Sequence, residues 1–394
     1  MISLGNNISS TKVVEPKYSA VFDGTDDYLS LDSFSSALSD DMAYSLSIWF
    51  KGDSNDTGAA ALNILFSVHL ANGANVLRIG VDKNGTKGVF YSCSGTSDHG
   101  DFGNVDLDDG AWHNIIITRT AGAGGQQSTL YIDGGSAITT NLDDTDPQFT
   151  NATQVSIGQE FDGTTKTDLY EGNIDEVAFW DVELDDASRL GVYAVGLEGH
   201  NLTSNKDAYD NSSDLIGYWR MGNGLFDDKA NGIVHDQVNP GFGINLWDGA
   251  NGDVTNWSPF GNNTVEEDDG TLKFTYVDNS AGPYIYLRDA YHLSDDLVVG
   301  ATYELSITTK VNTGSVGWRL QHNSYPYYHF PSLTSTDFVT QSETFIATTA
   351  ASHYLFVAAF GTGEIVWVKD ITVRKLNGNP GFTSGGPTFS SDTP

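Results

Sequence analysis

Cysteine is nearly absent from the sequence, since Cys93 is the only one among 394 residues. A chain with one thiol forms no internal disulfide and no cysteine-based metal site, which excludes the small disulfide-stapled scaffolds. Basic side chains are also scarce, 19 against 52 acidic ones, and the formal net charge is -33. Nucleic acid and anionic membrane surfaces both attract basic faces, so this charge argues against both partners.

Long apolar runs are missing as well. The opening MISLGNNISSTK has no apolar core of signal-peptide length, and no later run is long enough to span a bilayer. The sequence therefore predicts a protein that is made in a cytoplasm, has no signal peptide and does not insert into a membrane.

Aromatic residues are abundant, with 20 Phe, 18 Tyr and 8 Trp, and this much ring surface must be buried in a folded core. Strand-like runs such as YSLSIWFKG (residues 44–52) and TYELSITTKV (residues 302–311) alternate with turns rich in Gly, Asp and Asn. This pattern is typical of β-sandwiches. Only DDASRLGVYAVG, residues 185–196, has the pattern of a helix.

Junctions rich in proline and glycine and changes of composition along the chain predict four segments. We expect an N-terminal arm over residues 1–17, a first sandwich over 18–238, a second over 239–376 and a C-terminal arm over 377–394. The predicted fold is all-β, with two tandem β-sandwiches of jelly-roll type and non-regular arms at both ends. Because the arms cannot form a core of their own, we expect them to pack against other copies of the chain.

Several motifs of the first sandwich point to one superfamily. AVFDGTDDYLSL, DDGAWHNIIITR, STLYIDG and YEGNIDEVAFWD occur in this order along the chain. In this order they resemble the concanavalin A-like superfamily, in its laminin-G-like and pentraxin-like branch. The resemblance implies a lectin-like jelly roll, a fold that carries hydrolases, lectins and passive adhesion modules alike.

Hydrolases of that superfamily carry three acids on one face of one strand. The nearest pattern here is Glu171, Asp175 and Glu176. Neighbouring residues of a regular strand point to opposite faces, so Asp175 and Glu176 are expected to face apart. A retaining glycosidase needs two carboxyls about 5 Å apart, and this pattern predicts that the protein is not an enzyme.

The run GQEFD (residues 158–162) resembles the turn that holds calcium in pentraxins. The side chains that the resemblance implies as calcium ligands are Glu160, Asp162, Asp168, Asn72 and Asn75. Calcium prefers clustered oxygen ligands of these types. The alternative is that the acids are solvated loop residues in an acidic chain.

A second acidic group, Asp23, Asp26 and Asp27, lies in FDGTDD. A hairpin turn explains this run more simply than a metal site does.

The second sandwich opens with NLWDGANGDVTNW and closes with VWVKDITVRKL, and it resembles carbohydrate-binding-module jelly rolls. Such modules lay flat sugar rings on aromatic side chains. The aromatic residues that the resemblance implies for glycan binding are Trp318, Tyr325, Tyr327, Tyr328, Tyr284 and Tyr286. The alternative is that these rings fill the core or an oligomer contact.

The whole arrangement, with its MISLGNN leader and NGNPG tail, resembles structural proteins of marine bacteriophage particles. The resemblance implies a non-enzymatic virion protein, made in the host cytoplasm, that acts as a tail fibre, spike or capsid decoration. Its expected partners are other virion proteins, copies of itself and host surface glycans. Two alternatives stay open: a polysaccharide hydrolase or lyase with an accessory module, and an architectural decoration without a ligand.

Overall fold

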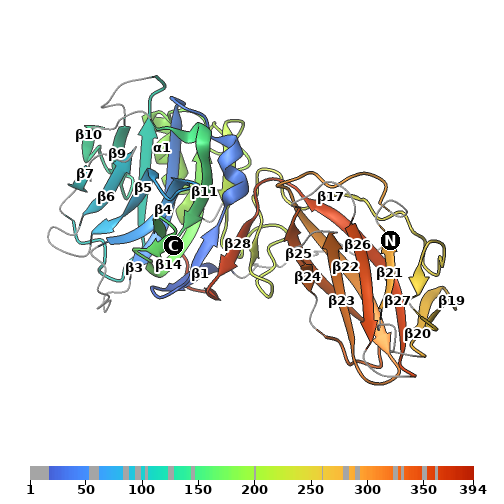
Figure 1. Ribbon diagram of the computed structural model, residues 1–394. Helices are drawn as coiled ribbons and strands as arrows, with labels where there is room; N and C mark the ends of the chain where they lie inside the picture. The colour runs from blue at the N-terminus through green and yellow to red at the C-terminus, as the bar shows by residue number, and fades with distance from the viewer. Residues whose placement is uncertain are drawn as a thin grey trace, which may run out of the picture. The chain divides into compact units, whose positions relative to one another are not determined.

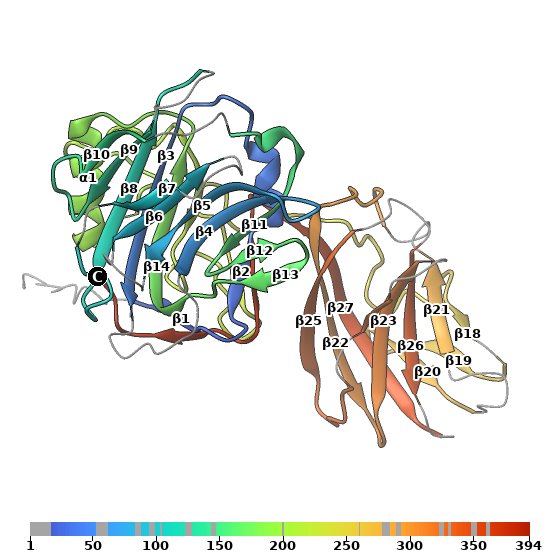
Figure 2. The ribbon, with the colours of Figure 1, turned by 60° about the vertical axis from the view of Figure 1, so that its left-hand side comes forward.

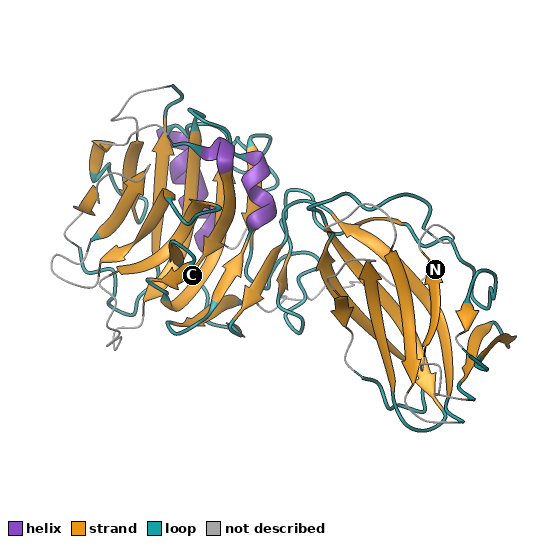
Figure 3. Cartoon of the chain, in the orientation of Figure 1, coloured by secondary structure: helices purple, strands orange, loops and turns teal. Residues whose placement is uncertain are grey.

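The computed structural model divides the chain into two compact units, one made of residues 1–240 with 378–394 and the other of residues 241–377 (Figure 1). The residues that the structure describes are 17–52, 62–82, 88–93, 99–102, 105–122, 128–142, 147–198, 201–259, 261–277, 284–288, 293–322, 327–329, 332–347, 353–359 and 363–394. Within them almost all of the regular secondary structure is strand (Figure 3), and no helix is long or apolar enough to cross a bilayer. The predicted all-β fold with two sandwiches is confirmed.

Two eight-stranded antiparallel sheets form the first unit. Sheet A contains, in spatial order, β10 (Thr139–Leu142), β9 (Ser128–Ile132), β8 (His113–Arg119), β3 (Tyr44–Gly52), β14 (Glu171–Trp180), β1 (Ser19–Asp23) and β29 (Thr388–Ser390), with β15 (Leu215–Trp219) also paired to β14. Sheet B contains β16 (Ile233–Val234), β28 (Gly381–Ser384), β2 (Tyr28–Ser30), β11 (Ala152–Ile157), β4 (Leu62–Leu70), β5 (Asn75–Asp82), β6 (Val89–Cys93) and β7 (His99–Phe102). A separate hairpin of β12 (Glu160–Asp162) and β13 (Thr165–Thr167) follows β11 (Figure 2).

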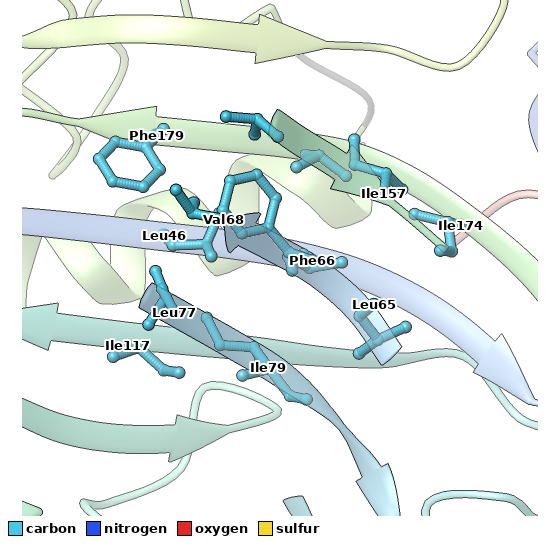
Figure 4. Packing of buried hydrophobic residues seen from close by; sticks show 14 of the residues in the cluster. Leu46, Leu65, Phe66, Val68, Leu77, Ile79, Ile117, Ile157, Ile174 and Phe179 are labelled. Carbon is cyan, nitrogen blue, oxygen red and sulfur yellow. The ribbon is translucent and has the colours of Figure 1, made fainter. Parts of the chain in front are cut away.

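The core of the first unit lies between sheets A and B. Alternate residues of facing strands interlock there, as Figure 4 shows for Leu46 and Ile174 of sheet A and for Phe66 and Ile79 of sheet B. Cys93 is buried in the same cluster, as expected for a small apolar residue. The short 3-10 turns Asp32–Ala37 and Phe149–Asn151 each contribute one buried phenylalanine to it.

The helix α1 (Asp186–Glu198) covers part of the outer face of sheet A, the face that points away from this core. Its Val192 packs in a second cluster with Ile116 and Ala178. Tyr193 stacks on Trp49 of β3, with ring centroids 5.3 Å apart. The helix leaves the rest of the outer face of sheet A uncovered, and a surface site can lie there.

The C-terminal segment is not the irregular arm that its composition predicts. It returns to the first unit, where β28 lies between β16 and β2, and β29 pairs with β1. The second unit is thus an insertion between two neighbouring strands of the first. Hydrogen bonds join the segments on either side of the insertion. Trp219 Nε1 donates to the carbonyl of Asn379 (2.8 Å), and Asp236 accepts from the N–H of Asn379 (3.1 Å).

The second unit is also a sandwich. Sheet C contains β19 (Thr264–Asp268), β20 (Thr271–Thr275), β27 (Ile365–Leu376), β22 (Thr302–Val311) and β25 (Val339–Ile346), with β17 (Phe242–Asn245) paired to β27. Sheet D contains β18 (Ser258–Pro259), β21 (Tyr284–Arg288), β26 (His353–Ala359), β23 (Val316–His322) and β24 (Tyr327–His329). The alternation predicted for β22 is confirmed, since Tyr303, Leu305 and Ile307 are buried in the core.

Candidate functional site

Glu160, the central residue of the predicted calcium loop, already has a cation beside it. It begins β12, its side chain is almost fully buried, and its Oε2 accepts a hydrogen bond from Arg78 Nη1 at 2.8 Å. Burial and the neighbouring Asp168 raise the pKa of Glu160 to about 7, against the opposing effect of Arg78. Sequence reasoning missed Arg78, whose position on β5 places it within reach of Glu160.

The amide of Asn75 belongs to the same buried network. Oriented to match its neighbours, it donates to His69 Nδ1 (3.0 Å) and accepts from Arg78 Nη1 (3.3 Å). Burial first and Arg78 second lower the pKa of His69 to about 4, so this histidine is neutral at physiological pH. Asn75 is thus turned toward a guanidinium and an imidazole.

The remaining predicted ligands have different surroundings. Asp162 is exposed at the hairpin, Asp168 is half-buried near Glu160, and Asn72 Oδ1 accepts from the N–H of Ala74 (3.1 Å). Among the described residues, the one acidic group with ligand atoms all within 4.8 Å of each other is elsewhere. Calcium binding by the five side chains stays a prediction.

That other group is Asp23, Asp26 and Asp27. Asp23 Oδ1 accepts from the N–H of Thr25 (2.8 Å), and Asp27 Oδ2 accepts from the N–H of Asp23 (3.1 Å). The three acids thus shape a turn, as expected. The turn is not a hairpin, however, because β1 belongs to sheet A and β2 to sheet B.

The expectation that Asp175 and Glu176 face apart is wrong. Ile174 and Val177 both point into the core, and two residues stand between them where a regular strand has one. The register of β14 with β3 slips at this point, and Glu176 has a φ of 48°. This β-bulge places both carboxyls on the outer side of sheet A.

The two acids nevertheless do not line an open groove, since Asp175 is 1% and Glu176 5% exposed. Arg220 binds Glu176 through Nη2 at 3.0 Å and through Nε at 3.1 Å. Tyr218 donates its hydroxyl to the same carboxylate. Both acids are therefore part of a buried network rather than a substrate site.

Burial raises the pKa of Asp175 well above its usual range, and the charge of Glu176 adds to the effect. Because the pKa is raised in the folded state, this contribution to stability is complete below the unfolded pKa and is lost as pH rises. Above the pKa of an unfolded aspartate, about 3.9, the free energy of unfolding is therefore expected to fall as pH rises. Asp175→Asn should remove this slope in urea titrations, whereas Asp26→Asn, an exposed control, should keep it; equal slopes in both variants would contradict the prediction.

A cleft of about 430 Å³ lies on the outer face of sheet A, where β1, β14 and β3 run side by side. Its polar lining consists of Asp23, Lys51, Glu171 and Asn173. Lys51 pairs with Asn173 across the strands, and Asp23 pairs with Glu171. Alternation along β1, β3 and β14 brings these four side chains to the same face, so the cleft combines donors with acceptors.

The C-terminal segment contributes to the rim of this face. The carboxylate of Asp392 accepts from Lys51 Nζ (2.6 Å) and from Trp112 Nε1 (3.0 Å), and its carbonyl accepts from Ser19 Oγ (2.5 Å). Sequence reasoning named Asp23 and Glu171 in other roles but missed Lys51 and Asn173. Lys51 and Asn173 share one face of sheet A with Asp23 and Glu171, but this face forms only when the strands pair in the folded chain.

The aromatic residues predicted for glycan binding have different outcomes. Trp318 is 2% exposed and packs in the core of the second unit, so its predicted role on a sugar platform is wrong. The backbones of Tyr284 and Tyr286 lie in β21, and those of Tyr327 and Tyr328 in β24; their side chains and the whole of Tyr325 lie outside the described residues. Glycan binding by these tyrosines stays a prediction.

Comparison with known protein families finds a match within the first unit. Residues 23–188 match the sequence model of the concanavalin A-like lectin/glucanases superfamily. Similar solved structures include a native heptameric SAP-like pentraxin from Limulus polyphemus, 17% identical, which covers 46% of this chain and 82% of its own with a TM-score of 0.34.

Two carbohydrate-binding modules are also similar. A mutant of a family 29 module is 15% identical and covers 34% of this chain and 89% of its own, with a TM-score of 0.27. A family 4 module is 17% identical and covers 33% of this chain and 96% of its own, with a TM-score of 0.25. The comparison with curated proteins found no match. The predicted resemblance to the concanavalin A-like superfamily is thus confirmed for residues 23–188, which contain most strands of the first sandwich.

Proposed function

We propose that the protein is a non-enzymatic, glycan-binding adhesion protein and that the cleft on sheet A takes a saccharide. The cleft carries this proposal, because two of its three strands, β3 and β14, lie within the part of the chain that matches the lectin/glucanase superfamily, and β1 reaches it at Asp23. Lys51 and Asn173 offer donors, Asp23 and Glu171 offer acceptors, and Val21 gives an apolar contact. Sugar hydroxyls pair with such mixed donors and acceptors in concave sites.

The burial of Asp175 and Glu176 supports a binding role over a catalytic one. Glu176 is held by Arg220 and Tyr218, so it is not available to attack or protonate a glycosidic bond. One observation favours the hydrolase alternative: Asp23 and Glu171 are cross-strand partners and line the same cleft. A glycosidase would use two such carboxyls on either side of the bond.

A glycan array probed with the full chain tests the proposal. We expect binding that Asn173→Ala abolishes, because the amide lines the cleft and has an acceptor oxygen and a second N–H besides the one that donates to Ser19 Oγ (2.9 Å). Release of reducing ends from any bound glycan, lost in Glu171→Gln, would identify an enzyme instead. Silence on the array, combined with tight binding to a virus particle, would support the architectural alternative.

The predicted tyrosines of the second unit form a second proposed glycan surface. Tyr284→Ala and Tyr327→Ala are expected to weaken binding to a subset of array glycans while leaving ligands of the cleft unaffected. Each lost stacking contact should cost about 1 kcal/mol, or roughly fivefold in affinity. Unchanged binding by both variants would remove the second surface from the proposal.

Calcium binding by the Glu160 loop is proposed with weak affinity, because the ion would have to compete with Arg78 for Glu160. Extracellular modules bind calcium with dissociation constants of about 10⁻⁴ to 10⁻³ M. Calcium at tenfold that concentration is expected to stabilise the chain by about 1.4 kcal/mol, seen as a raised melting temperature. Asp162→Asn should lose the shift and Asp26→Asn should keep it; an equal shift with magnesium, or none at all, would count against the site.

We also propose that the protein is exposed on a virus particle, as a tail fibre, spike or capsid decoration. The acidic composition and the lectin-like first unit support an outward-facing role. Because residues 378–394 form β28 and β29 of the two sheets, we propose residues 1–17 as the anchor, of which 1–16 lie outside the described residues. Detection of the chain in purified particles, lost when residues 1–16 are deleted, tests this assignment.

A further inference from the structure

Basic and aromatic side chains gather on the outer face of sheet C. Lys273 of β20 and Lys310 of β22 are both direct cross-strand partners of Trp367 on β27. Phe338 immediately precedes β25, the neighbour of β22. Together with Lys369, these residues form what we call the Trp367 patch, defined as Lys273, Lys310, Phe338, Trp367 and Lys369.

Strand alternation places the patch on the surface. Val366 and Val368, on either side of Trp367, are both buried in the core of the second unit, so Trp367 points the other way. A β-bulge follows: β27 slips in register against β22, and Asp370 has a φ of 50°. Lys369 lies two residues after Trp367 and ahead of Asp370, so alternation places it on the same outer side as Trp367.

The lysines of the patch lie over its rings. Lys310 Nζ is 4.6 Å from the ring centroid of Phe338 and 4.9 Å from that of Trp367. Lys369 Nζ is also 4.6 Å from the centroid of Phe338. These cation–π contacts hold the ammonium groups beside the ring faces. Phe338 itself is 37% exposed.

The acids near the patch pair with two of its three lysines. Lys273 is paired with Glu266 at 2.7 Å, Lys369 approaches Asp370 at 3.8 Å, and Trp367 Nε1 donates to Asp268 at 2.8 Å. Over the described part of the chain, Lys310 contacts rings and no carboxylate. In a protein with 19 basic and 52 acidic residues, such a concentration of lysines on two rings is unusual.

We propose that the Trp367 patch binds an anionic saccharide, with a sugar ring against Phe338 and Trp367 and the anionic group on Lys310. An aromatic face takes the apolar side of a sugar ring, and an ammonium group takes a carboxylate or sulfate. The inference rests on the proposed glycan-binding function and names a ligand class that the cleft on sheet A, with its two acids, does not favour. The anion is either a uronate carboxylate or a sulfate ester.

Affinity electrophoresis of the full chain through gels containing polygalacturonate, dextran sulfate or neutral dextran tests the proposal. We expect retardation by one or both anionic polymers and none by dextran, and the retarding polymer identifies the anion. Lys310→Gln is expected to weaken retardation about fivefold. Phe338→Ala, which removes an exposed ring and no charge, should weaken it by a similar factor. Added salt should reduce the Lys310 effect more than the Phe338 effect.

Lys375→Gln is the matched control, since Lys375 is an exposed lysine of the same sheet, on β27, outside the patch. Equal loss in Lys310→Gln and Lys375→Gln would show nonspecific attraction and overturn the proposal, as would retardation by dextran alone. If no anionic polymer retards the chain while the array still shows binding that Asn173→Ala abolishes, the patch fails and the cleft stands. If the array shows no binding and polygalacturonate retards the parent chain more than the Lys310→Gln variant, the patch is supported and the cleft is not.

Discussion

Deleting residues 378–394 is expected to unfold the first unit, although composition alone makes this segment appear dispensable. The deletion removes β28 from between β16 and β2 and removes β29 from the edge of β1. Gly381 packs so closely on the core that an added Cβ would lie 2.7 Å from side-chain carbons of Leu29 and Leu31. The segment is therefore part of the sandwich, and its loss opens both sheets at once.

The expected cost is comparable to the whole stability of a domain. Each lost ladder hydrogen bond costs about 1 kcal/mol, and more where the abandoned partner stays buried. Several such bonds, with the burial of Phe389, add up to on the order of 5–10 kcal/mol, the usual net stability of a domain. Hydrogen exchange followed by mass spectrometry should show loss of protection in β1, β2 and β11, while β22 and β27 of the second unit stay protected.

Two controls separate the strands from the chain end. Deleting residues 391–394 removes only the contacts of Asp392, whose ion pair with Lys51 is exposed, and is expected to cost less than about 1 kcal/mol. Gly381→Val keeps the full length but forces two methyl groups into the core, at a cost of about 1–3 kcal/mol. A chain cut after Asn377 that retains native protection in β1 and β2 would show that the returning strands are accessory.

The return of the C-terminal segment could not be predicted from the sequence, and the reason is physical. GFTS and TFS are too short to show a period of two, and they lie among glycines and prolines that are typical of loops. Their partners β2 and β1 lie more than 350 residues earlier in the chain. A strand this short is specified by the edges that receive it, and those edges exist only after the rest of the sheet has formed.

Longer elements were predicted well because each carries its own pattern. The run at residues 44–52 was assigned as a strand from its aromatic and β-branched residues, and β3 has these bounds. The helix predicted over residues 185–196 is α1, Asp186–Glu198. The alternation in β22 identified its buried face, because the extra residue of the bulge opposite Ile307 lies on β27 and β22 itself stays regular.

The candidate site was predicted less well, because strand parity was applied across a bulge. The adjacency of Asp175 and Glu176 implies opposite faces only when the backbone is regular, and the positive φ of Glu176 breaks that condition. The prediction of the calcium loop was incomplete in a similar way, because it identified the acids but not Arg78. Arg78 lies 82 residues before Glu160, and its approach to Glu160 depends on the packing of β5 against the hairpin. Pairings across the sheet also created the cleft, as with Asp23 and Glu171.

Replacing Glu176 by Gln is expected to cost about 3–5 kcal/mol, because it leaves the guanidinium of Arg220 buried without its counter-charge. Two nitrogens of Arg220 and the hydroxyl of Tyr218 converge on this carboxylate. Glutamine keeps the shape and offers one acceptor oxygen, but its NH₂ group faces donors. Urea denaturation of the first unit should show a lower midpoint with an unchanged slope.

Three further variants distinguish the charge network from the backbone strain at the bulge. Glu183→Gln makes the same chemical change at an exposed position and should stay within about 0.5 kcal/mol of the parent chain. Arg220→Met leaves Glu176 without its cation, and the double variant Glu176→Gln/Arg220→Met should recover part of the loss, since no buried charge is then left alone. Glu176→Gly relieves the positive φ while removing the carboxylate, so a cost as large as that of Glu176→Gln would assign the stability to the ion pair. If Glu176→Gly is instead as stable as the parent chain, the network contributes little, and the bulge is maintained by the packing of Ile174 and Val177 on either side.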